Sequence, residues 1–218
     1  MEPVLPKGLP RGSPAGRREQ TKQQNRQIIL TAARQVFAEM GYGAATVRDI
    51  IRATPLASGT FYNYFKSKEE VYQAIRDEVA LAIRPRLHAE RTKAATLEEF
   101  VAGSIRAYFD YVAEEKENYR ALGHGDEPSL NGFDTPGMIA GFSELREDIR
   151  LAIAKGLFPP VDTEYLTAAM VGVAREVAAH MVARHAPDPA AAAEFVYALF
   201  LGGIRALPEV AAITPSDE

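Results

Sequence analysis

The most informative segment of the sequence is GYGAATVRDIIRATPLASGTFYNYFKSKEE, residues 41–70. Within it, Thr46 and Asp49 have the spacing of a helix-capping box, and apolar residues follow at helical intervals. A short helix is therefore expected from here to about Ala53. Because proline lacks the N–H that a helix interior needs, Pro55 is expected to break the helix and to form part of a tight turn.

Ser58 is expected to cap a second helix, which should run through Phe65. At 3.6 residues per turn, one side of this helix is aromatic and the opposite side carries small or polar residues, namely Gly59, Thr60 and Asn63. A helix that enters the major groove of DNA needs hydrogen-bonding side chains at the base edges and little bulk around them. The two helices and their turn therefore predict a DNA-binding helix-turn-helix.

Four residues in or just after the second helix can donate hydrogen bonds to phosphate oxygens: Tyr62, Tyr64, Lys66 and Lys68. The alternative is that the aromatic residues here only pack a small three-helix core. We adopt that interpretation for the two phenylalanines of the segment. For the tyrosines, phosphate contact is favoured, because a tyrosine can pack with its ring and still present its hydroxyl.

This segment resembles the DNA-binding domain of the tetracycline-repressor (TetR) family of bacterial transcription regulators. The resemblance covers roughly residues 20–76, and the rest of the chain is similar only in its helical character and length. One position departs from the pattern, because Pro55 stands in the turn where the family usually has a glycine, so a differently shaped turn is expected. The matching residues are Phe37, Gly41, Tyr42, the segment 46–50 and the segment 59–69.

The resemblance implies roles for individual residues. The residues that it places near bases are Arg48, Ser58, Thr60 and Asn63. The residues that it places on the DNA backbone are Thr46, Tyr62, Tyr64 and Lys68. Arg48 is the best candidate for a bidentate contact with guanine. The resemblance also implies repression, a ligand-binding domain and a dimer.

Composition agrees with a separate DNA-binding domain. The chain has 218 residues, 47% of them hydrophobic, and a net charge of −4. Residues 1–76 hold 12 Lys and Arg against 6 Asp and Glu, which gives +6, whereas residues 77–218 hold 13 against 23, which gives −10. Basic charge is therefore concentrated where DNA would bind. The absence of cysteine excludes disulfides and thiolate metal sites, and is compatible with a cytoplasmic location.

The pattern predicts three regions: a disordered basic arm over residues 1–18, a helix-turn-helix domain over 19–66, and a helical regulatory and dimerisation domain over 67–218. The first 18 residues contain four prolines and three glycines, and their arginines could follow DNA or form an idle tail. The most apolar run, Phe195 to Ile204, is shorter than the roughly 20 residues that span a bilayer, so a buried helix and no membrane partner are expected.

The fold is expected to be all-α, with about nine helices. Gly41 should end the first helix, Ser67 should cap a helix that Pro85 stops or kinks, and Thr96 with Glu99 should open the next. A glycine-rich loop is expected from Ala121 to Gly137. The expected longer helices are Gln20–Met40, Lys68–Arg84, Thr96 to about Val112, Met138–Ile153, Asp162–Arg184 and Asp188–Leu207.

The last two expected helices are rich in alanine and glycine, which allows helix axes to approach closely. Two such helices from each of two subunits would form a four-helix interface, as the resemblance also implies; packing within one chain is the alternative. A homodimer could read a palindromic operator in double-stranded DNA.

A small-molecule effector is the other expected partner, and it should be apolar or amphipathic; an orphan regulator that needs no ligand is the alternative. Each candidate pocket residue could instead be ordinary core or surface. The candidates for an apolar wall are Tyr108, Phe109, Phe133, Met138, Phe142 and Met170, and the candidates for polar anchors are His124, Arg175 and His180. No cofactor is expected.

Two other function classes are weaker. A helical enzyme could use His124 beside Asp126 and Glu127, but one histidine and two acids on a glycine-rich loop form a solvated turn more often than a catalytic or metal site. His180 and His185 are five residues apart and do not converge on one ion, so no metal site is expected. An architectural DNA binder is disfavoured by the acidic remainder of the chain.

Overall fold

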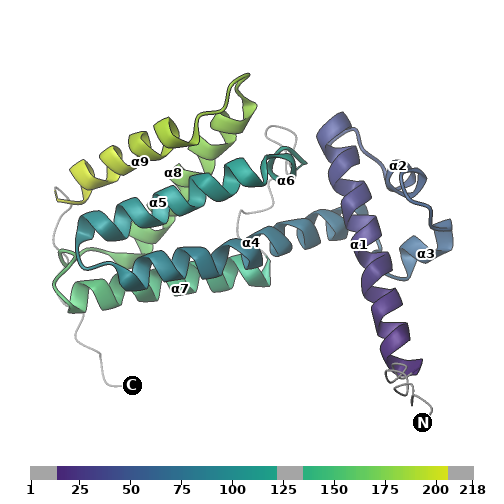
Figure 1. The fold of residues 1–218 in the computed structure, drawn as a ribbon, viewed down its shortest axis with the longest axis horizontal. Coiled ribbons are helices and arrows are strands. Elements are labelled where there is room, and N and C mark those ends of the chain that lie inside the picture. The colour runs from purple at the N-terminus through teal and green to yellow at the C-terminus, as the bar shows by residue number, and fades with distance from the viewer. Residues whose placement is uncertain (1–13, 122–134, 206–218) are drawn as a thin grey trace, which may run out of the picture.

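The computed structural model describes residues 14–121 and 135–205, and the regular secondary structure in these ranges consists of α-helices (Figure 1). This confirms the expected all-α fold. Two parts are joined by α4: a small helix-turn-helix domain at one end, formed by α1 to α3, and a larger C-terminal domain. The helices are α1 (Pro14–Met40), α2 (Val47–Arg52), α3 (Ser58–Tyr62), α4 (Lys68–Lys93), α5 (Leu97–Glu114), α6 (Lys116–Ala121), α7 (Pro136–Ala154), α8 (Thr163–Ala183) and α9 (Pro189–Ile204).

The helix-turn-helix domain forms largely as its local sequence predicts. Thr46 caps α2 in a complete capping box with Asp49, and Gly41 ends α1 with a φ of 76°, a conformation that glycine adopts without steric cost. Aromatic and aliphatic side chains from all three helices and from the start of α4 form one core. Phe61 and Phe65 are buried in it, as expected.

The turn and α3 differ from the prediction in detail. Ser58 is the first residue of α3 and not its cap, because the chain enters the helix at Ala57, whose carbonyl accepts the Thr60 N–H at 2.8 Å. The helix ends at Tyr62, three residues before Phe65.

Pro55 is accommodated without a glycine. The Thr54 hydroxyl donates to the Ile51 carbonyl at 2.9 Å and accepts the Leu56 N–H at 3.2 Å, so a side chain closes the turn.

The first helix begins at Pro14, earlier than the expected Gln20, so residues 14–18 belong to α1 and not to an arm. Proline suits the first position of a helix, where its missing N–H is not needed. The remainder of the expected basic arm lies outside the described residues.

The fourth helix does not stop at Arg84, so of the two effects expected of Pro85, a stop or a kink, the stop was wrong. It continues through Pro85 to Lys93. Pro85 is exposed, and so is Leu81, the residue four positions earlier whose carbonyl loses its helical hydrogen bond. The N-terminal half of α4 is buried in the helix-turn-helix domain through Tyr72 and Ile75, and the middle is buried in the C-terminal domain through Val79 and Ile83. One rigid element thus contributes to both cores.

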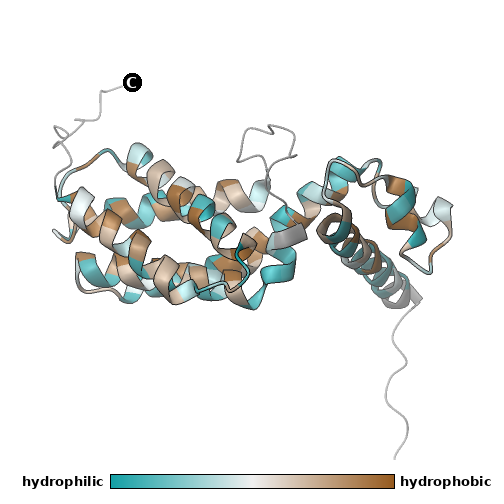
Figure 2. Ribbon diagram, turned by 90° about the horizontal axis from the view of Figure 1, so that it is seen from above, coloured by the Kyte–Doolittle hydropathy of each residue, from teal (hydrophilic) through white to brown (hydrophobic). Residues whose placement is uncertain are grey.

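In the C-terminal domain the apolar sides of the helices face one another, as the hydropathy colouring shows (Figure 2). Helix α5 packs against α4, α8 and α9, and α7 packs against α4 and α8. The short α6 was not predicted; it contacts both α8 and α1. Ala121 lies in α6 and α7 starts at Pro136, so the expected loop is shorter at both ends, and its residues 122–134 are outside the described part.

Among the described residues, α8 alone is long and apolar enough to cross a membrane by length and composition. However, it packs against α5, α6, α7 and α9. Leu166, Met170 and Val182 are among its side chains that are buried in the C-terminal core. This packing identifies α8 as a core helix of the bundle.

Candidate DNA-reading surface and effector cavity

The polar face of α2 and α3 is exposed. Arg48 on α2, Ser58 at the start of α3 and Asn63 just after α3 are all exposed, and Thr60 is partly buried. Phe61, on the opposite side of α3, is 2% exposed. The aromatic core therefore holds the helix with its small and polar side outward, as the sequence pattern predicts.

The side chains expected to contact phosphate have different environments. Tyr62 is 59% exposed, with its ring against Phe61, and Lys66 is exposed. Tyr64 is partly buried and its hydroxyl accepts a hydrogen bond from the Asn25 amide at 3.3 Å. The exposed Thr46 remains engaged in the capping box of α2.

Lys68 is bound within the protein. Its ammonium donates to the carbonyls of Tyr42, Gly43 and Ala45 at 2.8, 3.3 and 2.9 Å, and it lies 4.5 Å from the centre of the Tyr42 ring. Burial, with the neighbouring Glu69 carboxylate, raises the pKa of Tyr42 to about 12. The lysine thus ties the turn after α1 to the start of α4, which is a structural role that its sequence position did not indicate.

A carboxylate joins the helix-turn-helix domain to α4. Glu78 accepts hydrogen bonds from Arg34 at 2.6 Å, Arg26 at 2.8 Å and Gln27 at 2.9 Å, all from α1. Burial alone would raise the pKa of Glu78, but these three donors outweigh it and hold the pKa below 4.5. The preceding residue, Asp77, accepts the backbone N–H of Gly137 at 2.6 Å and so fixes the start of α7.

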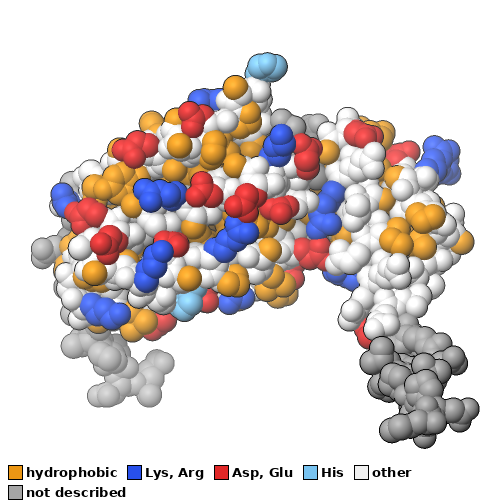
Figure 3. Space-filling view, viewed as in Figure 1, with side chains coloured by type: hydrophobic (Ala, Val, Ile, Leu, Met, Phe, Trp, Pro, Cys, Tyr) orange, Lys and Arg blue, Asp and Glu red, His pale blue; other side chains and the backbone are white. Residues whose placement is uncertain are grey.

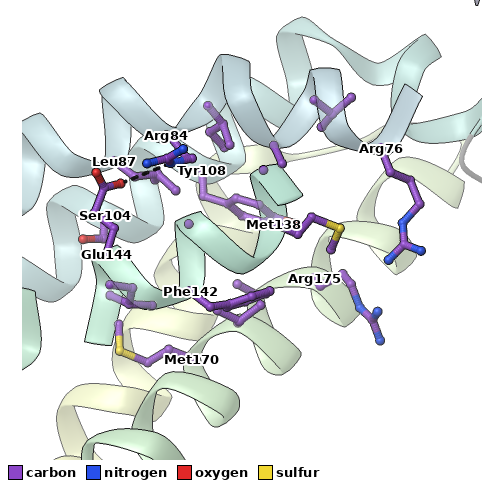
Figure 4. A pocket seen from close by; sticks show the side chains of 18 of the residues that line it. Arg76, Arg84, Leu87, Ser104, Tyr108, Met138, Phe142, Glu144, Met170 and Arg175 are labelled. Carbon is purple, nitrogen blue, oxygen red and sulfur yellow. Dashed lines mark ion pairs between the residues drawn. The ribbon is translucent and has the colours of Figure 1, made fainter. Parts of the chain in front are cut away.

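The C-terminal domain encloses a cavity of about 460 Å³ between α4, α5, α6, α7 and α8 (Figure 4). Five of the predicted pocket residues line it: Tyr108, Met138, Phe142, Met170 and Arg175. Phe109 is fully buried in the core and does not line the cavity, because it faces another side of α5. His180 is exposed on α8 beside Glu176, at 3.4 Å. His124 and Phe133 lie outside the described residues. The same holds for Asp126 and Glu127, the acids that were considered with His124 as an enzyme site.

Several lining residues were not predicted. Those with polar side chains are Tyr72, Arg76, Arg84, Arg91, Ser104, Tyr119, Glu144 and Glu176. Arg84, Leu87 and Arg91 follow one face of α4 at helical spacing, and this signal was missed because the helix was expected to stop or kink at Pro85. Tyr119 lies in α6, a helix that was not predicted from the sequence.

The two ends of the cavity differ in charge (Figure 4). At one end, Arg84 and Arg91 face Glu144, each at 3.6 Å, and Arg91 also donates to Asp148 at 2.6 Å. Arg76 from α4 and Arg175 from α8 lie at the other end.

Burial raises the pKa of two cavity tyrosines, Tyr108 and Tyr119. Burial raises the pKa of Tyr108 to about 12, although the Tyr119 hydroxyl and the charge of Arg175 act to lower it. The hydroxyl of Tyr108 is therefore a hydrogen-bonding group and not a charge.

Comparison with known proteins agrees with the helix-turn-helix geometry. Residues 29–75 match the family described as bacterial regulatory proteins, tetR family. The HTH-type transcriptional repressor DhaR of Mycobacterium sp. (strain GP1) is 33% identical over 88 residues, which are 40% of this chain and 41% of that protein. The match thus spans less than half of that repressor's length.

Solved structures extend the likeness to the C-terminal domain. The fatty acid degradation regulator FadR of Bacillus halodurans has a TM-score of 0.70 and 26% identity, over 83% of this chain and 96% of that one. The regulator FadR of Bacillus subtilis, in complex with stearoyl-CoA, has a TM-score of 0.68 and 23% identity, over 82% and 98%. With its helix-turn-helix, its single connecting helix and its helical second domain, the chain belongs to the TetR family of bacterial regulatory proteins.

Proposed function

We propose that this protein is a sequence-specific DNA-binding transcription regulator that acts as a homodimeric repressor. The observation that carries the proposal is the exposed polar face of α3 beside Arg48, in a part of the chain with net positive charge. The C-terminal domain, by contrast, shows interspersed acidic and basic side chains (Figure 3). The similarity to a known repressor supports repression over activation. A regulator of this kind acts at the chromosome, so we propose a cytoplasmic location.

In this proposal the bases are contacted by Arg48, Ser58, Thr60 and Asn63. The phosphates are contacted by Thr46, Tyr62, Tyr64 and Lys66, and helix α3 lies in the major groove. Lys68 supports the surface from behind, because three carbonyls already occupy its ammonium.

We assign dimerisation to α8 and α9. Tyr165, Phe195 and Leu199 are 79%, 60% and 51% exposed, and small residues such as Ala169 and Gly202 are exposed on the same two helices. Large exposed apolar side chains beside small ones suit close helix packing across a two-fold axis. A dimer would present two copies of α3 to the two halves of a palindrome.

We propose that a small apolar or amphipathic molecule fills the cavity and releases the protein from its operator. A relative of the same fold binds stearoyl-CoA, which supports a ligand-binding C-terminal domain. A ligand acts only through its preference for one state of the protein. A preference of about 3 kcal/mol for the non-binding state would lower operator affinity on the order of a hundredfold.

Helix α4 would carry the signal. Its neighbouring residues Arg76, Asp77 and Glu78 reach the cavity, α7 and α1 respectively. Tyr72 lines the cavity and is also buried in the core of the helix-turn-helix domain. A ligand that displaces α4 therefore acts directly on the orientation of α3.

The experiment that tests this function begins with selection of DNA from a random library by the purified protein. We expect a palindrome to be enriched. Arg48→Ala should weaken binding to it by about 1–3 kcal/mol and relax the preference at one base pair of each half-site, whereas Lys66→Ala should weaken all sequences alike and reduce the salt dependence. Equal effects of the two substitutions, or enrichment of no sequence, would contradict the proposal.

A further inference from the structure

We infer that the effector is an anionic amphiphile, with an apolar body inside the cavity and a negatively charged group bound by Arg76 and Arg175. This inference rests on the proposed function of the cavity as an effector site. It adds the charge of the ligand and the end of the cavity at which the charged group lies.

The middle of the cavity suits an apolar body. Tyr108, Met138 and Phe142 lie between its two charged ends, and Met170 completes the wall from α8 (Figure 4). Methionine side chains adapt to ligands of different shape, and a volume of about 460 Å³ falls in the range of small-molecule sites.

The Glu144 end offers no net charge to a ligand. Two arginines, Arg84 and Arg91, are balanced there by Glu144 and Asp148. The Arg84 Nε and the facing Glu144 oxygen are 3.6 Å apart, and both atoms are buried without a hydrogen bond. This end can accommodate a hydroxyl or a water molecule. A bound anion would be repelled by the carboxylate of Glu144, and a bound cation would be repelled by the guanidinium groups of Arg84 and Arg91.

Among the described residues that line the other end, two are basic, Arg76 and Arg175, and one is acidic, Glu176. Arg76 and Arg175 come from different helices and both line the cavity. The nearby acidic lining residue, Glu176, lies 3.4 Å from His180, one turn further along α8. In the described part of the chain, Arg175 has neither an ion pair nor a hydrogen bond, so it can bind an anion without giving up an existing partner.

Arg76 connects this end to the helix-turn-helix domain. Its guanidinium lies 5.9 Å from the centre of the Tyr72 ring, and Tyr72 packs edge-on against Phe37 of α1. An anion bound at Arg76 would thus act on a residue of the core that supports α2 and α3. The charged group of the ligand would therefore contact α4 at the end of the cavity that is closest to the helix-turn-helix core.

The test uses ligands with one alkyl chain and different head groups. Binding of decanoate, 1-decanol, decyltrimethylammonium and decanoyl-CoA to the full chain is measured by calorimetry without DNA. We expect decanoate to bind about tenfold or more tightly than decanol, because hydrogen bonds to charged groups are the stronger ones, and the ammonium to bind most weakly. Decanoyl-CoA distinguishes a small carboxylate from a larger phosphorylated head group, and preference for either anion supports the inference.

Variants locate the charged group. Arg175→Gln should weaken binding of the preferred anion about tenfold and leave decanol unchanged. Arg76→Gln should act in the same direction, and Arg175→Glu should favour the ammonium ligand. Arg106→Gln, at an exposed position of α5 outside the cavity, is the matched control and should change nothing.

The inference is overturned if decanol binds as tightly as both anions, if none of the four probes binds, or if Arg175→Gln weakens all ligands equally. Operator binding by the ligand-free protein is measured separately. Its absence would refute the proposed function, while the head-group preference would still be decided by calorimetry.

Discussion

Two lysines close to the start of α4 have opposite environments. Lys66 is exposed, whereas the ammonium of Lys68 donates to three carbonyls in the turn after α1. Removing the Lys68 ammonium would leave those carbonyls without a strong donor. We therefore expect Lys68→Ala to lower the free energy of unfolding by about 1–3 kcal/mol, measured by chemical denaturation.

Lys66→Ala is the matched control for this prediction. It should leave the unfolding free energy within about 0.5 kcal/mol of the wild type, as surface substitutions usually do, while weakening DNA binding. If Lys68→Ala were as stable as Lys66→Ala, the structural role of Lys68 would be wrong.

For individual residues, the helical periodicity of the sequence predicted which side chains are exposed, but it did not predict which groups they bind. The outward position of Arg48 and Asn63 follows from 3.6 residues per turn. The partners of Lys68 do not, because they depend on a turn 23 to 26 residues earlier in the chain. Ser58 was expected to cap α3, but the cap is Ala57, one residue earlier. Helix boundaries differ by one or two residues between methods of assignment, so a sequence pattern does not fix the terminal residue.

At the scale of elements, Glu78 controls how α1 is attached to α4. Because its folded pKa is held below the ordinary 4.5, the stability it provides is present above that pH and is lost as the pH falls through the lower, folded value. We expect the unfolding free energy of the wild type to decrease below pH 4.5 and this decrease to be shallower in Glu78→Gln.

The substitution should also lower stability at pH 7, by about 1–3 kcal/mol, since two arginines lose a charged acceptor. Denaturation curves recorded from pH 3 to pH 7 provide the measurement. Glu147→Gln, at an exposed position paired with Arg150 one turn away, is the control and should retain the wild-type slope. Identical slopes for both variants would exclude Glu78 as the source.

A second prediction for α4 concerns Pro85. An interior proline removes a hydrogen bond from the helix, so Pro85→Ala should stabilise the protein, by up to about 3 kcal/mol. Thermal or chemical unfolding measures the gain. Pro160→Ala, in the connection before α8, is the control and should give no gain, because no helix is interrupted there. An unchanged stability of Pro85→Ala would mean that α4 already compensates for the missing bond.

The elements that sequence could predict are those with local signals at their ends. Thr96 and Asp188 cap their helices, and Gly41 ends α1, all through contacts within a few residues. The passage of α4 through Pro85 is decided by burial on both sides of it, at Ile83 and Arg91, and not by the proline itself. The short α6 depends on packing against α1 and α8, which no local pattern reports.

The sequence predicted two features of the overall architecture: the division into a basic N-terminal and an acidic C-terminal region, and part of the cavity. Met138, Phe142 and Met170 were predicted because flexible apolar side chains are suited to ligand sites. Arg76 and Glu144 were not, since the closeness of α4, α7 and α8 is a product of tertiary packing. The position of the cavity beside α4 is what links its contents to the distant α3.

The exposed apolar side chains of α9 allow the proposed dimer interface to be tested. Phe195 and Leu199 lie one turn apart on α9 and are both largely exposed, so they should be buried only by a second copy. Replacing both by arginine would place two charges on each side of a two-fold interface and should separate the subunits. Light scattering should then report a monomer of 23.8 kDa, with the helical content unchanged.

Loss of the dimer should weaken operator binding far more than binding to one half-site, because each α3 would then have to bind alone. Ile139→Arg, at another large exposed hydrophobic residue but on α7, is the matched control and should remain dimeric. A double variant that is still dimeric and still binds the full palindrome would show that the subunits meet through another surface, and α8 and α9 would have to be removed from the proposed interface.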